Sequence, residues 1–110
     1  MALLDMSARE QGDTMVLALT GELDISSAGR VEKELTRAEE RQPGAIVLDL
    51  SALEFMDSTG LRIVVSADAR ARERGARFAV VRGPDAVQRI FRITRLDERL
   101  EMVDSADQLV

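Results

Sequence analysis

The chain has 110 residues, of which 45% are hydrophobic, and this size and composition fit a single domain with one core. Cysteine and histidine are both absent, which excludes a disulfide framework and a Cys–His metal site. The formal net charge of −5 argues against direct binding to nucleic acid.

The apolar residues nowhere form a run long enough to cross a membrane. Asp5 interrupts the apolar N-terminus early, so the start of the chain does not resemble a signal peptide. We therefore expect a cytoplasmic protein without a membrane span. Residues 1–60 carry 12 acidic and 5 basic side chains, whereas residues 61–110 carry 8 acidic and 10 basic ones, so a partner of the first half should be basic.

A β-hairpin is predicted at the start of the chain. Its first strand shows the alternation of a half-buried strand, with apolar residues at Leu4, Met6 and Ala8. A turn at 11–13 leads to a second strand over 15–20 that is apolar on both faces. The segment Gly21-Glu22-Leu23-Asp24 is expected to end this strand.

A helix is predicted next, and Asp24, Ser26 or Ser27 is expected to begin it. Its apolar face carries Val31, Leu35 and Ala38, and Pro43-Gly44 ends it. Residues 45–50 are apolar almost throughout, as in an internal strand. Residues 51–56 are expected to form a short connector to the following helix.

The second half of the chain repeats this alternation of helix and strand. A helix is predicted from Ser58 to about Arg74, with Gly75 as its stop and with apolar positions at Leu61, Val64, Val65, Ala69 and Ala71. A buried strand over 78–81 follows. A third helix opens at Gly83-Pro84-Asp85, and its inner face carries Val87, Ile90 and Phe91.

A strand near 100–103 and a short final helix that begins after Asp104-Ser105 complete the prediction. The order is therefore β-β-α-β-α-β-α, then β-α. We expect one α/β domain over residues 1–110, in which helices pack on a mixed sheet with an N-terminal hairpin.

The chain is organised around Asp57-Ser58-Thr59-Gly60-Leu61, where an apolar strand passes into a helix. A hydroxyl at a helix start lies among unpaired N–H groups at the positive end of the dipole, so a phosphate there would meet backbone donors. The structural alternative is that Asp57, Ser58 and Thr59 only cap and begin the helix.

Several other chemistries are excluded at this segment. A serine hydrolase needs a base beside its nucleophile, and the chain has no histidine and only Lys33, in a charged helical run. A receiver domain could use Asp49 or Asp57 as phosphoacceptor, but no lysine follows and the hairpin breaks strict alternation of strands and helices. No glycine-rich loop joins a strand to a helix, as nucleotide binding would require.

Three segments stand out together: Thr20-Gly21-Glu22-Leu23-Asp24, then Val47-Leu48-Asp49-Leu50 with Phe55-Met56-Asp57-Ser58-Thr59-Gly60-Leu61, and Ala86-Val87-Gln88-Arg89-Ile90-Phe91. Together they resemble the STAS domain, and most of all its stand-alone form, the anti-sigma factor antagonist. The similarity covers nearly the whole chain in order and spacing, and the middle segment is the most specific.

This resemblance implies a switch and not an enzyme. A partner that is both anti-sigma factor and serine kinase would phosphorylate Ser58 with its own ATP and Mg²⁺, so that the chain itself needs no cofactor. The unphosphorylated form would bind this partner and release sigma factor, the phosphorylated form would let go, and a serine phosphatase would reset the switch.

The partner-binding residues implied by the resemblance lie on both sides of Ser58: Gly21, Glu22, Leu23, Asp24, Asp57, Thr59, Gly60, Leu61 and Arg62. Asp24 has a structural alternative as a helix cap, and both roles stay open. STAS domains also occur as interaction modules of lipid-transport complexes and anion transporters. A non-switching subunit of such a complex is therefore the alternative function, although an intact serine after Asp57 favours the switch.

Overall fold

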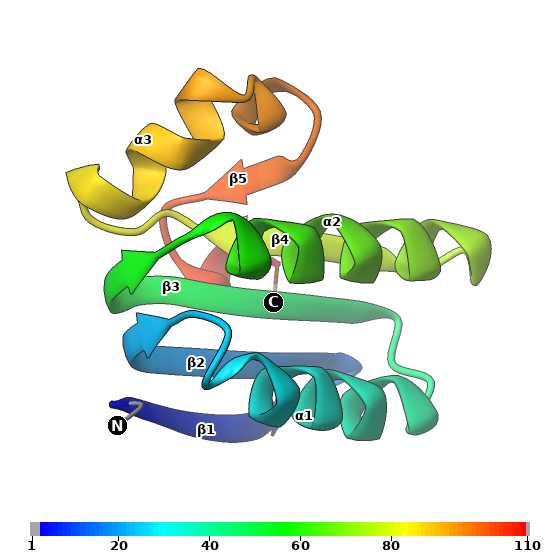
Figure 1. Cartoon of the computed structure of the whole chain (residues 1–110). Coiled ribbons are helices and arrows are strands. Elements are labelled where there is room, and N and C mark those ends of the chain that lie inside the picture. The colour runs from blue at the N-terminus through cyan, green and yellow to red at the C-terminus, as the bar shows by residue number, and fades with distance from the viewer. Residues whose placement is uncertain (1–2, 110) are drawn as a thin grey trace.

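The computed structural model describes residues 3–109, which form one five-stranded sheet with helices against it (Figure 1). The strands lie in the sheet in the order of the sequence: β1 (Leu4–Gln11), β2 (Thr14–Leu23), β3 (Ala45–Met56), β4 (Arg77–Val81) and β5 (Glu101–Val103). β1 and β2 are antiparallel, and every later neighbour is parallel. The predicted mixed sheet with an N-terminal hairpin is confirmed.

Each pair of neighbouring parallel strands is joined through a helix. α1 (Ala28–Glu40) follows β2, α2 (Ser58–Glu73) follows β3, and α3 (Asp85–Ile93) follows β4. Two short 3-10 helices complete the chain, η1 (Leu96–Glu98) before β5 and η2 (Ala106–Leu109) after it. The predicted order is confirmed, with η1 as an addition and with the final helix as a single 3-10 segment.

The main core lies between one face of the sheet and the three α-helices. Right-handed crossovers between successive parallel strands place the helices on the same face, and Figure 1 shows α1 and α2 side by side in front of the sheet. The strands contribute alternate residues to this core, among them Leu17, Leu48 and Val80. A smaller cluster on the opposite face joins Val47 and Ala79 to η2 through Ala106.

Two strands run further than their sequence indicates. β2 continues from Thr20 through Leu23, and β3 includes the residues predicted as a connector, up to Met56. The two extensions pair with each other, with Glu22 opposite Phe55 and Leu23 opposite Met56. Register shifts in this part of the ladder break the simple alternation of buried and exposed residues, which is why the pattern did not predict a strand.

The inner face of α2 also differs from the prediction. The buried residues are Gly60, Ile63, Val64, Ala67 and Ala71, whereas Val65 and Ala69 point to solvent. A helix that packs through Gly60 is rotated relative to one that packs through Leu61, because neighbouring residues are about 100° apart. The predicted inner faces of α1 and α3 are confirmed, except that Ile90 on α3 is only partly buried. On β1 only Leu4 is buried and Met6 partly so, whereas Ala8 is exposed because β1 is the edge strand.

Candidate functional site

The hydroxyl of Ser58 is exposed at the first residue of α2. Asp57 is the N-cap: its backbone is extended, and its Oδ1 accepts a hydrogen bond of 2.9 Å from the Thr59 N–H. The Asp57 carbonyl also accepts the N–H of Leu61 at 3.2 Å. Asp57 therefore caps the helix. The Ser58 side chain makes no hydrogen bond within residues 3–109.

Backbone donors remain available beside that hydroxyl. Among residues 3–109, the first-turn N–H groups of Ser58 and Gly60 have no acceptor, while that of Thr59 is taken by Asp57. Such donors and the helix dipole favour an anion. A phosphate on Ser58 would therefore meet a favourable backbone environment, although it would also add charge beside the Asp57 carboxylate.

Gly60 lets the start of α2 approach the sheet closely. A Cβ at this position would lie 2.5 Å from Met56 Cγ and 2.9 Å from Leu23 Cγ. Both of these side chains are buried at the ends of β3 and β2. Glycine is thus needed for packing here. Gly60 and Leu23 are buried under the site, whereas Leu61 is half-buried.

The segment 21–24 lies directly beside the start of α2. The β2–β3 pairing places Leu23 opposite Met56, and the Asp57 N–H donates to the Leu23 carbonyl at 3.3 Å. Glu22 and Asp24 are half-buried and flank this contact. Two segments more than 30 residues apart in sequence therefore form one surface at the same end of the sheet.

Gly21 sets the course of the chain into this segment. Its φ of +106° is unfavourable for other residues, and a Cβ there would overlap the Leu3 carbonyl. The Glu22 N–H donates to that same carbonyl at 2.8 Å, which ties the segment to the start of β1. Gly21 is therefore a structural requirement of this surface.

Asp24 caps a turn and does not cap α1. Its Oδ1 accepts from the Ser26 N–H at 2.9 Å and from the Ser26 hydroxyl at 2.6 Å. The N-cap of α1 is Ser27, whose buried hydroxyl donates to the Glu22 carbonyl and accepts from the Asp24 N–H. The hydrogen bond from the Ser26 hydroxyl lowers the pKa of Asp24, so this carboxylate stays charged at neutral pH.

Two exposed apolar side chains flank this surface, and sequence reasoning did not single them out. Ile25 in the turn after β2 is 82% exposed, and Phe55 near the end of β3 is 46% exposed. Phe55 is the partner of Glu22 in the β2–β3 ladder, which places it next to the segment 21–24. For Ile25 the sequence held a signal, because this apolar residue lies between Asp24 and Ser26, whereas Phe55 is followed by Met56 and only the strand pairing shows its exposure.

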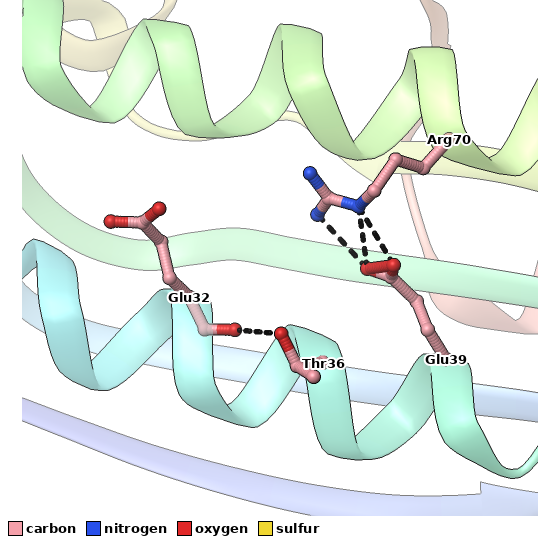
Figure 2. A network of polar contacts seen from close by, with 4 residues as sticks. All are labelled: Glu32, Thr36, Glu39 and Arg70. Atoms are coloured by element: carbon pink, nitrogen blue, oxygen red, sulfur yellow. Dashed lines mark hydrogen bonds and ion pairs between the residues drawn. The ribbon is translucent and has the colours of Figure 1, made fainter.

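Arg62 is exposed on α2, one turn after Ser58, and lines a groove between α1 and α2. The groove has a volume of about 290 Å³ and also borders Thr59, Ser66 and Glu32. Arg70 of α2 also lines this groove, and Figure 2 shows its guanidinium paired with Glu39 of α1, with Nε–Oε1 at 2.7 Å. Within residues 3–109, Arg62 takes part in no such pair.

Residues 3–109 lack two features that mark other classes of protein. In the part of the chain that it describes, no group of three or more acidic side chains is placed to hold a metal ion. No helix among residues 3–109 is both long and apolar enough to span a membrane.

Comparisons with known proteins agree on one family. The sequence model of the STAS domain family matches residues 5–109. The anti-sigma-F factor antagonist RsfB of Mycobacterium tuberculosis is 26% identical over 99 residues, which cover 90% of this chain and 80% of RsfB. The anti-sigma-B factor antagonist of Listeria monocytogenes is 29% identical over 90 residues, which cover 82% of this chain and 79% of the relative.

A solved structure has the same fold. The crystal structure of an anti-sigma factor antagonist from Mycobacterium paratuberculosis superposes with a TM-score of 0.88 at 26% identity, and the match covers 96% of this chain and 90% of that one. The match of the family to residues 5–109 and the agreement in fold lead to one conclusion. This chain belongs to the STAS domain family.

Proposed function

We propose that this protein is an anti-sigma factor antagonist that works as a phosphorylation-controlled partner switch. In this proposal the unphosphorylated form binds an anti-sigma factor that is also a serine kinase, and sigma factor is released. Phosphorylation of Ser58 abolishes that binding. The proposal is supported by the relatives of this chain, which are anti-sigma factor antagonists.

The observation that carries the proposal is the position of the Ser58 hydroxyl. It is exposed at the start of α2, its neighbour Asp57 already caps the helix, and the segment 21–24 lies alongside. A kinase can therefore reach the hydroxyl without unfolding the domain. The same kinase can contact Glu22 and Asp24 while it does so.

The effect of the phosphate follows from electrostatics. Phosphorylation adds about −1.5 to −2 charges at neutral pH. In a protein–protein contact this charge would be desolvated beside Asp57, Glu22 and Asp24, all of which are acidic. A loss of about 3 kcal/mol in binding free energy would weaken the complex on the order of a hundredfold. Phosphorylation of Ser58 would thus release this protein from the kinase.

Exposed apolar side chains add a second element to this surface. Ile25 and Phe55 would supply the buried anchors that a stable contact needs, with the acidic residues at the rim. The kinase would bring its own ATP and Mg²⁺, and a serine phosphatase would restore the unmodified form. All of these components would meet in the cytoplasm.

The experiment begins with candidate anti-sigma factor kinases from the source genome, each purified and mixed with this protein. Binding is measured by calorimetry, and phosphorylation with ATP and Mg²⁺ is mapped by mass spectrometry. We expect phosphate on Ser58, no phosphate on the variant Ser58→Ala, and binding at least about a hundredfold weaker for the phosphorylated form.

The matched control is Thr59→Ala, which removes the adjacent hydroxyl and leaves Ser58 in place. It should be phosphorylated like the wild type. Phosphate on Thr59 with Ser58 unmodified would contradict the assignment. Binding to a partner that is unchanged by phosphorylation would instead support a non-switching subunit of a lipid or anion transport complex.

A further inference from the structure

The outer edge of β1 is an open strand edge. β1 lies at one end of the sheet, and no strand pairs with its outer side among residues 3–109. It has eight residues, without proline, and pairs with β2 in an unbroken register. The opposite edge is different, because β5 has only three residues. Long, regular edges of this kind are templates for pairing with another strand.

The hydrogen-bonding groups of β1 that face outward can be identified. The Leu3 carbonyl accepts the Glu22 N–H and so points toward β2, whereas the Leu4 carbonyl accepts Arg30 Nη1 at 2.8 Å and points away from it. Successive residues of an antiparallel strand alternate in this way. With an unbroken register, Met6 and Ala8 direct their N–H and C=O groups to the open edge.

Two of the three charged residues of β1 are arranged symmetrically about Ser7, and the third, Glu10, pairs with Arg41 of its own chain. Asp5 and Arg9 lie two residues before and two residues after Ser7, both exposed and on the same face of the strand. Neither takes part in an ion pair within the described residues. A strand with opposite charges at equal distances from its centre is complementary to an antiparallel copy of itself.

We propose that β1 pairs antiparallel with β1 of a second copy of this chain, around a two-fold axis at Ser7. Met6 then forms hydrogen-bonded pairs with Ala8 of the second copy. Asp5 faces Arg9 of the second copy, and the symmetric pair forms on the other side of the axis. These two ion pairs fall at non-hydrogen-bonded positions, where opposite side chains lie closest.

The surface next to this edge also fits a second copy. A groove of about 310 Å³ runs between β1 and α1, with Met6, Ala8 and Leu17 on the sheet side. Lys33 and Glu34 of α1 line its other side, so the rim carries both signs of charge. A two-fold mate therefore meets a mixed surface and not a repulsive field of one sign. Ser58 lies on α2 and is left exposed by this arrangement.

The test uses charge exchange and sedimentation equilibrium of the full chain from about 5 to 500 μM, because an interface of one strand pair should be weak. We expect the wild type to pass from monomer to dimer within this range. Asp5→Arg alone and Arg9→Asp alone each place like charges opposite one another twice. Each should raise the dimer dissociation constant at least about tenfold.

Complementation makes the test specific. A mixture of Asp5→Arg with Arg9→Asp restores two opposite-charge pairs in a heterodimer, and the double variant restores them in a homodimer. Both should dimerise like the wild type. A wild type that is monomeric throughout, or a mixture that fails to dimerise, overturns the proposal.

A backbone variant tests the pairing without changing charge. Ala8→Pro removes an N–H that faces the open edge, so it should abolish the dimer while circular dichroism shows a folded monomer. Ser7→Pro is the matched control, because it removes a hydrogen bond to β2 and should lower the thermal midpoint. A folded Ala8→Pro variant that still dimerises would contradict the proposed pairing, and if this variant does not fold, the charge variants decide.

Discussion

Replacement of Gly60 by alanine tests whether close packing at the start of α2 builds the site. Alanine is favoured over glycine inside a helix by about 0.8–1 kcal/mol. At Gly60 the new Cβ would lie 2.5 Å from Met56 Cγ and 2.9 Å from Leu23 Cγ, both closer than normal van der Waals contact. Such overpacking of a core costs about 1–3 kcal/mol, so the net effect should be destabilisation by roughly 0–2 kcal/mol.

Gly29 supplies a matched control in the first turn of α1. It is exposed, and a Cβ there would meet nothing within 4 Å. The same substitution should therefore stabilise the protein by about 0.5–1 kcal/mol. The difference between the two variants isolates the packing cost, and it should amount to about 1–3 kcal/mol.

Urea denaturation followed by circular dichroism measures both variants, and the thermal midpoint gives a second reading. For a domain of this size, 1 kcal/mol corresponds to about 4 °C. A shift of the α2 start away from β2 should also weaken binding to the kinase, whereas Gly29→Ala should leave it unchanged. Equal stabilisation by both substitutions would refute the packing argument.

Three further predictions concern charged groups. Asp24→Asn keeps an acceptor for Ser26 but removes the charge, so kinase binding measured by calorimetry should weaken at low salt, and the loss should shrink as salt rises. Equal affinities at low salt would leave Asp24 with a structural role only. Arg62→Ala should destabilise only the phosphorylated form, because a guanidinium one turn away can pair with the phosphate. The loss in free energy of unfolding should reach up to about 1 kcal/mol and appear as a lower thermal midpoint. The same variant should also weaken binding of the unmodified form to the kinase. An equal loss of stability in both forms, together with unchanged kinase affinity, would contradict both the phosphate contact and the kinase contact. The hydrogen bond from Arg77 lowers the pKa of Glu101, so the stability that this pair adds should be fully present at neutral pH and be lost as the pH falls through the lowered pKa. Urea denaturation of Glu101→Gln should show a small loss of stability at pH 7, since the pair is exposed, and a smaller loss at pH 3; an equal loss at both pH values would point to packing instead.

The order of the elements could be predicted from local patterns because each pattern is set by a few neighbouring residues. The stop of α2 at Gly75 and the inner face of α1 at Val31, Leu35 and Ala38 are confirmed. The exposed hydroxyl at the start of α2 was also predictable, because Asp57 is a good N-cap and places Ser58 first in the helix.

The tertiary structure decided the rest, because it depends on contacts between distant segments. The lengths of β2 and β3 follow from their pairing with each other, which local alternation does not record. The same pairing brings Glu22 beside Phe55 and gives Gly60 its packing role against Leu23. By itself, the sequence determined that a serine stands at a helix start. Only the fold decided which acidic and apolar side chains surround that serine, because strand register sets their neighbours.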